Sequence, residues 1–189
     1  MSRSLLLASL GLLLHAIVAA LAVALGWDAL PVAPAVVLVA YAALAEPPIE
    51  AAISATLLGF MLDALSGSPI GMNMLACLLA LLLGRLAAGA VAAPRGLGAF
   101  VFGGAMSMGY HLFLLIVLFM FDSEREAFGI LGILSTAVFD GLLALVLMPT
   151  TQVLFISLGL EEREVTMTER LSYGARTANL RKQRAGMKG

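Results

Sequence analysis

Residues 59–73 read GFMLDALSGSPIGMN and place a cluster of polar and turn-forming residues between two apolar stretches. The part from Ser66 to Gly71 has the composition of a tight turn, because glycine allows positive φ, proline fixes φ at about −65° and serine bonds nearby backbone. Asp63 lies about one turn before it and Asn73 one turn after it, so both side chains can accept hydrogen bonds there. The stretch therefore predicts a helical hairpin whose polar groups are paired with one another.

The apolar character of the flanks extends along most of the chain. Of the 189 residues, 61% are hydrophobic and 12% are charged, and the mean hydropathy is +1.03. Soluble domains average about 45–50% apolar and about 25% charged residues. This composition indicates an integral membrane protein and argues against a cytosolic enzyme, a nucleic-acid-binding module and a secreted disulfide-rich fold. Cys77 is the only cysteine, so the chain cannot form an internal disulfide.

A spanning helix needs about 20 apolar residues, which leaves room for about six. Division at proline, glycine and charged clusters predicts an all-α membrane protein with six transmembrane helices in a compact bundle, at residues 5–26, 29–46, 49–65, 70–92, 97–121 and 128–158. The first segment is longer than a signal-peptide core, which favours a retained helix. The last contains Pro149, which predicts a kink or a helix that extends beyond the membrane. Residues 1–160 would form the membrane domain and residues 161–189 a basic tail.

The positive charges predict which helix ends face the cytoplasm. With a cytoplasmic N-terminus, ten of the eleven Lys and Arg residues fall on the cytoplasmic side, and Arg125 alone falls outside. Six of the ten belong to residues 165–189, whose single acidic residue is Glu169. Six spans then place both termini in the cytoplasm. The tail is either only a topology determinant beside anionic lipids or a contact for a cytoplasmic partner such as a filament.

Ionisable side chains inside the spans cost about 2.5–3.5 kcal/mol each on insertion scales, so each one suggests a specific role. Arg85 lies near the inner end of the fourth segment, where it can reach the interface or pair with Glu46 or Glu50. His111 and Asp140 lie at similar depths in the fifth and sixth segments, at a rise of about 1.5 Å per residue. A direct hydrogen bond between them would lock the two helices together; a proton relay or a ligand site is the alternative.

Two further features indicate how the helices pack. His15 lies at mid-depth in the first segment, which predicts a hydrogen bond to another helix rather than a site. Small residues in the fifth segment allow helix backbones to approach closely, within the bundle or with other membrane subunits; they are Gly98, Gly103, Gly104 and Gly109.

The pattern Asp63-x-x-Ser66-Gly67-Ser68-Pro69-x-Gly71-x-Asn73, between the third and fourth of about six helices, resembles the MreD family of bacterial rod-shape-determining proteins. The recurring signature of that family falls on Asp63, Gly67, Pro69 and Gly71, and the matching stretch also includes Ser66 and Asn73. The remainder of the chain agrees with the family only in the number of spans, the topology and a short cytoplasmic tail.

The resemblance implies a non-enzymatic scaffold subunit of the cell-elongation complex in the bacterial inner membrane, which helps to maintain cell shape. It implies binding to the single-span periplasmic protein MreC. Directly or through MreC, it implies contact with a RodA-like glycosyltransferase for peptidoglycan synthesis and a class B penicillin-binding transpeptidase, with MreB filaments as a further partner. Membrane lipids are expected as neighbours, and neither a cofactor nor a nucleic acid is expected. The hairpin residues would either contact a partner or shape the fold.

MreD-like chains are also similar to the substrate-binding S-components of energy-coupling-factor vitamin transporters, which are six-helix proteins of similar size. That alternative requires an outer pocket with converging polar groups, and the predicted outer loops are short. An enzyme is not expected, because the candidate catalytic groups are scattered over different segments and depths; they are His15, Asp63, Cys77, His111 and Asp140.

Overall fold

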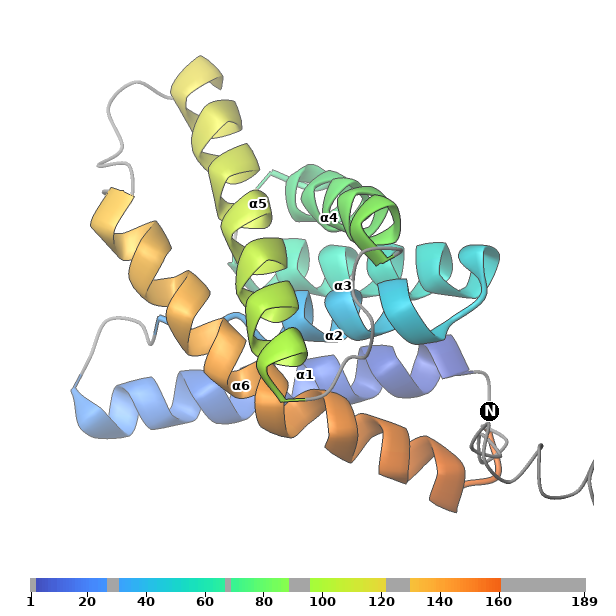
Figure 1. The fold of residues 1–189 in the computed structure, drawn as a ribbon. Coiled ribbons are helices and arrows are strands. Elements are labelled where there is room, and N and C mark those ends of the chain that lie inside the picture. The colour runs from blue at the N-terminus through green and yellow to red at the C-terminus, as the bar shows by residue number, and fades with distance from the viewer. Residues whose placement is uncertain (1–2, 27–30, 67–68, 89–95, 122–129, 161–189) are drawn as a thin grey trace, which may run out of the picture. The chain divides into compact units, whose positions relative to one another are not determined.

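The computed structural model describes residues 3–26, 31–66, 69–88, 96–121 and 130–160, which contain six helices and no strand (Figure 1). The helices are α1 (Arg3–Leu25), α2 (Pro34–Ala45), α3 (Pro48–Ser66), α4 (Met72–Ala88), α5 (Leu97–Phe121) and α6 (Ile130–Ser157). Each predicted segment corresponds to one of them, which confirms the all-helical fold class. The predicted basic tail lies outside the described residues, as do Gly67 and Ser68 of the hairpin.

Four of these helices are long and apolar enough to cross a membrane: α1, α3, α5 and α6. Their length and composition indicate a multi-pass membrane protein. The other two are shorter, with 12 residues in α2 and 17 in α4. At about 1.5 Å per residue they measure about 18 and about 25 Å, less than the hydrocarbon thickness of about 30 Å.

The short helix α2 forms the centre of the packed helices. Ten of its twelve residues are buried, including the continuous run from Pro34 to Ala43. It packs against α1, α3, α4 and α5. A helix that is apolar on all sides is stable only when it is surrounded, which explains why the sequence of α2 shows no polar face. The most extensive packing of all joins α3 to α4.

The joint between α2 and α3 follows from two consecutive prolines, Pro47 and Pro48. Glu46 ends α2 in an extended conformation, with φ −98° and ψ 153°, and its N–H donates to Ala42 O at 3.1 Å. Proline disfavours helical geometry in the residue before it but suits the first position of a helix. Pro48 is that first residue of α3, so only Glu46 and Pro47 separate the two helices.

The chain divides into two compact units, residues 1–153 and 154–189, with the boundary inside α6. This helix has 28 residues, about 42 Å, and runs continuously through Pro149. It ends where Gly159 adopts a φ of +67° and the N–H of Leu160 donates to Phe155 O at 2.9 Å. A left-handed glycine with this bond is the Schellman arrangement that closes many helices.

Candidate functional site

Asp63 lies in the last turn of α3, and its carboxylate caps the first turn of α4. Oδ2 accepts hydrogen bonds from the N–H groups of Gly71 at 2.8 Å and Met74 at 3.4 Å, and Oδ1 accepts from the N–H of Asn73 at 2.8 Å. The first N–H groups of a helix have no partner within it and attract negative charge. Asp63 is 2% exposed and serves α4 as an N-cap residue would, but from the neighbouring helix.

Two glycines permit this geometry. Gly71 has a φ of +100°, a conformation that other residues adopt only with strain. Gly59 faces the start of α4, where a Cβ atom would lie 2.4 Å from Met74 Cα and 2.8 Å from the carbonyl oxygen of Asn73. The backbones of α3 and α4 therefore touch at Gly59, four residues before Asp63, which brings the carboxylate within reach of the free N–H groups.

Asn73 connects the hairpin to a third helix. Its Nδ2 donates to Ser66 Oγ at 3.3 Å, and its Oδ1 accepts from the Tyr110 hydroxyl of α5 at 2.5 Å. Asn73 is buried, as is Tyr110. The side chain thus closes the hairpin locally and also fixes it to α5.

The described residues of the matching stretch differ in their exposure. Asp63 and Asn73 point inward, whereas Ser66 and Pro69 are exposed. Next to them, Ile70 is 85% exposed and Leu65 is also exposed. Asp63 and Asn73 therefore shape the hairpin, and its described surface includes exposed apolar side chains beside Ser66.

Asp140 of α6 holds the beginning of α2. Its carboxylate is 0% exposed, and Oδ1 accepts from the N–H of Ala33, the N-cap residue of α2, at 2.7 Å. Oδ2 accepts from the Ser107 hydroxyl of α5 at 2.5 Å. One carboxylate thus connects α6, α5 and the start of α2, and both of its oxygens are engaged.

His111 joins this cluster through Ser107. Its Nδ1 lies 2.8 Å from the carbonyl oxygen of Ser107 and 3.3 Å from the Ser107 hydroxyl. A carbonyl oxygen only accepts, so Nδ1 carries a hydrogen. The direct bond predicted between His111 and Asp140 is not among the contacts of the described residues. Ser107 lies one helical turn before His111 on the same face of α5, and it occupies the position next to the carboxylate.

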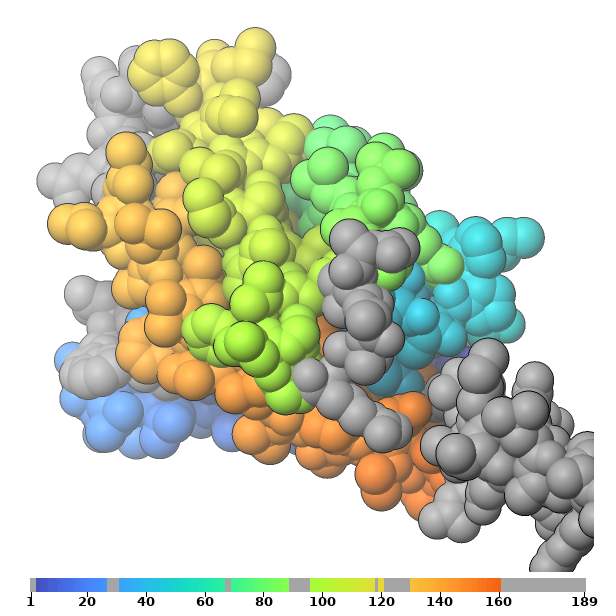
Figure 2. Space-filling view, viewed as in Figure 1, coloured from blue at the N-terminus to red at the C-terminus, as the bar shows by residue number. Residues whose placement is uncertain are grey.

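Glycines bring α5 and α6 together around Asp140. A Cβ on Gly104 would lie 2.9 Å from the Ala137 carbonyl oxygen, and one on Gly103 would lie 2.5 Å from Ala144 Cβ. From the other side, a Cβ on Gly141 would lie 2.8 Å from the Phe100 carbonyl oxygen. Figure 2 shows the side chains of the two helices lying directly against each other. Of the predicted small residues, Gly103 and Gly104 therefore serve packing within the chain.

Arg85 meets Glu46, as predicted, but at the backbone. A guanidinium nitrogen of Arg85 donates to the carbonyl oxygen of Glu46, and Nε has no hydrogen-bond partner within the described residues. The Glu46 carboxyl group is buried, and its Oε2 accepts from the Ser54 hydroxyl at 2.7 Å. Burial raises the pKa of Glu46, which lies in the joint between α2 and α3, and the nearby charge of Glu50 adds to this rise.

The remaining candidate residues are not brought together. His15 is half-buried, and its Nδ1 has no hydrogen-bond partner in the described part of the chain, so the predicted interhelical bond is not found at that atom. Cys77 is buried in α4. Among the described residues, no three metal-ligating side chains lie together.

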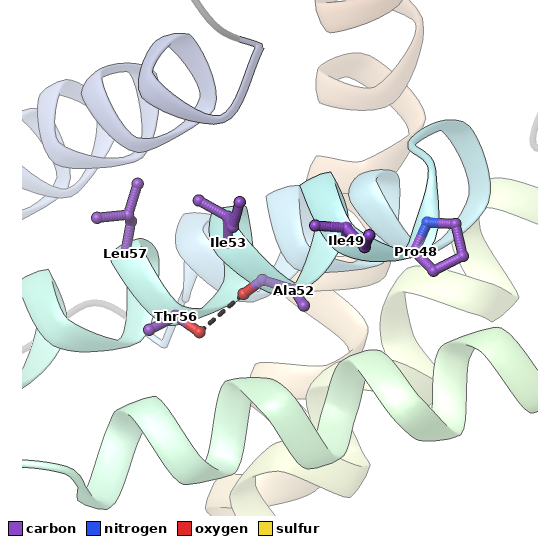
Figure 3. Close-up of a pocket in the computed structure, with 6 residues that line it drawn as sticks. All are labelled: Pro48, Ile49, Ala52, Ile53, Thr56 and Leu57. Atoms are coloured by element: carbon purple, nitrogen blue, oxygen red, sulfur yellow. Dashed lines mark hydrogen bonds between the residues drawn. The ribbon is translucent and has the colours of Figure 1, made fainter.

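A groove runs along the surface of α3, lined by Pro48, Ile49, Ala52, Ile53, Thr56 and Leu57 (Figure 3). Thr56 supplies its one polar side chain, whose hydroxyl donates to the carbonyl oxygen of Ala52 at 2.7 Å within the helix. Such a lining offers no converging polar groups to a vitamin.

The polar contacts of Ser54, Ser107 and Tyr110 were among those not predicted from the sequence. A partial signal exists for Ser107, which precedes His111 by four residues and so shares its face of the helix. For Tyr110 the pairing depends on which helices are neighbours, which the hydropathy pattern does not show. The Ser54 pairing is local, with Glu46 eight residues earlier, and no specific signal in the sequence indicated it.

Comparison of the chain with protein-family models, with curated proteins and with solved structures finds no match.

Proposed function

We propose that the chain is a non-enzymatic scaffold subunit of the bacterial cell-elongation complex, with the role that its resemblance to MreD implies. In this proposal all six helices lie within the inner membrane and both termini face the cytoplasm. The hairpin between α3 and α4 would lie at the outer surface and contact an MreC-like partner, through which peptidoglycan synthases are positioned.

One observation supports this proposal above the others: the carboxylate of Asp63 bonds three backbone N–H groups of the hairpin. The signature residue thus fixes the start of α4 against the end of α3 without exposing a charge. A scaffold needs a rigid surface rather than a reactive one, because rigid contacts lose less conformational entropy on binding.

The described part of the hairpin exposes apolar side chains to such a partner, beside the exposed Ser66. Ile70 is 85% exposed at the tip of the hairpin, and Leu65 and Pro69 are exposed beside it. Central apolar anchors supply much of the affinity in protein interfaces. The groove on α3 does not itself support the vitamin-transporter alternative, since it lacks polar groups suited to a small ligand.

The test is affinity purification from the native membrane in mild detergent, comparing Ile70→Asn with the wild type. Ile49→Asn is the matched control, because Ile49 is 77% exposed at the opposite end of α3. We expect Ile70→Asn to reduce recovery of the single-span periplasmic partner about tenfold or more, and Ile49→Asn to leave it unchanged. Equal recovery with both variants would show that the hairpin is not the contact. Co-purification of a vitamin or an ATPase pair would replace the scaffold proposal by the transporter one.

A further inference from the structure

Glu46 is a buried carboxyl group with one unsatisfied oxygen. It is 3% exposed at the joint between α2 and α3, and its Oε2 accepts a hydrogen bond from Ser54. Its Oε1 is buried and has no hydrogen-bond partner among the described residues. An ionised carboxylate carries charge on both oxygens and normally accepts several hydrogen bonds. Leaving one charged oxygen without a donor away from water is costly.

The charged groups around Glu46 come from three helices. They are Arg3 of α1, Glu50 of α3 and Arg85 of α4. Arg85 is oriented toward the carbonyl oxygen of Glu46, and that bond leaves Oε1 without a donor. Burial is the largest influence on the pKa of Glu46 and raises it, and the charge of Glu50 also raises it. The hydrogen bond from Ser54 and the charges of the two arginines act in the opposite direction.

We propose that Glu46 is a proton-binding site of the folded protein, with the proton carried on Oε1. In this form Oε2 is the carbonyl oxygen of a neutral acid and still accepts the hydrogen bond from Ser54. When the proton leaves to water, the carboxylate attracts the guanidinium of Arg85, which then exchanges the backbone carbonyl of Glu46 for the carboxylate. Proton binding thereby decides how the inner end of α4 is attached to the joint between α2 and α3. This inference does not depend on the proposed scaffold function.

Infrared spectroscopy of the full chain in lipid nanodiscs tests the proposal at mildly acidic pH, where an ordinary exposed glutamate is still ionised. A protonated carboxyl group has a C=O stretching band well separated from the bands of ionised carboxylates. We expect Glu46→Gln to remove one carboxyl group's share of that band. Glu50→Gln, a half-exposed glutamate of the same cluster, should instead remove carboxylate intensity. A difference spectrum in which Glu46→Gln removes only carboxylate bands would overturn the proposal.

Ser54→Ala provides a second variant that keeps the carboxyl group itself. Loss of the Ser54 hydrogen bond to a neutral C=O shifts the stretching band of the acid to higher frequency. If Glu46 is ionised, the acid band has no contribution from it and stays where it is, which contradicts the proposal even if Glu46→Gln does not fold.

The pH dependence of thermal unfolding gives an independent measurement. A raised pKa in the folded chain means that folding binds protons, so this contribution to stability is complete below the ordinary value of 4.5 and is lost as pH rises through the folded pKa. In Glu46→Gln, the stability should fall less steeply as pH rises through that range. A pH profile of thermal unfolding equal to that of the wild type would contradict the proposed proton-binding site.

Discussion

The two short helices, α2 and α4, both begin at a buried aspartate that belongs to another helix. Asp63 of α3 holds the start of α4, and Asp140 of α6 holds the start of α2. The first aspartate bonds three backbone N–H groups that are 8, 10 and 11 residues away. The second bonds one backbone N–H 107 residues away and a serine hydroxyl 33 residues away.

The two sites differ in the kind of group that donates hydrogen bonds to the carboxylate. A backbone N–H only donates, so the three groups around Asp63 require an acceptor in every position. A serine hydroxyl rotates and can donate or accept, so the Ser107 side of Asp140 tolerates either kind of partner. The α3–α4 hairpin is therefore specified more strictly than the junction of α2, α5 and α6, although the carboxylate is buried in both.

The largest effect is expected from Gly59→Ala, which tests how strictly the hairpin is specified. The new methyl group would lie 2.4 Å from Met74 Cα, so the backbone of α4 would have to move away from Asp63. We expect a loss of about 3 kcal/mol or more in the free energy of unfolding, at or above the upper end for overpacked sites. Equilibrium unfolding in mixed micelles containing SDS measures it.

Gly109→Ala is the matched control, because the nearest atom to its new Cβ is Leu83 Cδ1 at 3.7 Å, an ordinary contact. There the higher helix propensity of alanine should leave stability unchanged or raise it by up to about 1 kcal/mol. Equal losses for the two substitutions would mean that the close approach at Gly59 is not what holds the hairpin.

Asp63→Asn is expected to cost about 2–3 kcal/mol, because an amide NH₂ would have to face a backbone N–H of α4 and the favourable charge at the helix start is lost. The same unfolding measurement applies. Hydrogen exchange at the amides of Gly71, Asn73 and Met74 should become faster at the same time. Protection at these amides equal to that of the wild type would contradict the capping role.

Tyr110→Phe removes the hydroxyl that donates to Asn73 Oδ1 and leaves that oxygen one donor short. We expect a loss of about 1–1.5 kcal/mol. The substitution removes the hydrogen bond between the hairpin and α5 without altering the bonds of Asp63. The backbone amide of Asn73 should therefore stay protected from hydrogen exchange. Faster exchange there would show that the hairpin depends on α5 and is less self-contained than the comparison implies.

The same two aspartates show what the sequence could and could not predict. The hairpin was predicted with its boundaries and with Asp63 as an acceptor, because donors and acceptor lie within eleven residues and turn chemistry is local. Likewise Pro47 and Pro48 marked the joint after α2, since proline acts on adjacent backbone. These features do not depend on how the helices are arranged.

The surroundings of Asp140 were predicted only in part. The rise per residue predicted that Asp140 and His111 lie at similar depths, and their helices, α6 and α5, are indeed neighbours. The predicted depth was not accurate enough to distinguish residues one helical turn apart. Ser107, one turn away from His111, takes the position beside the carboxylate. The bond to Ala33 was not predicted, because it depends on where the start of α2 lies against α6. Long-range contacts of this kind follow from packing, which hydropathy does not encode.

Asp140→Asn should have the smallest effect, about 1 kcal/mol or less, and so completes the comparison. Asparagine keeps an oxygen for the N–H of Ala33 and offers its NH₂ to Ser107 Oγ, while the Ser107 hydroxyl turns to the carbonyl one turn earlier in α5, as serines in helices often do. In a Ser107→Ala background this rescue is lost, so Asp140→Asn should then cost more than it does in the wild type. Asp140→Asn could instead reduce the free energy of unfolding as much as Asp63→Asn does. In that case the rotating hydroxyl of Ser107 is not what makes the two sites differ. The charge of the carboxylate itself would then be what the junction of α2, α5 and α6 requires.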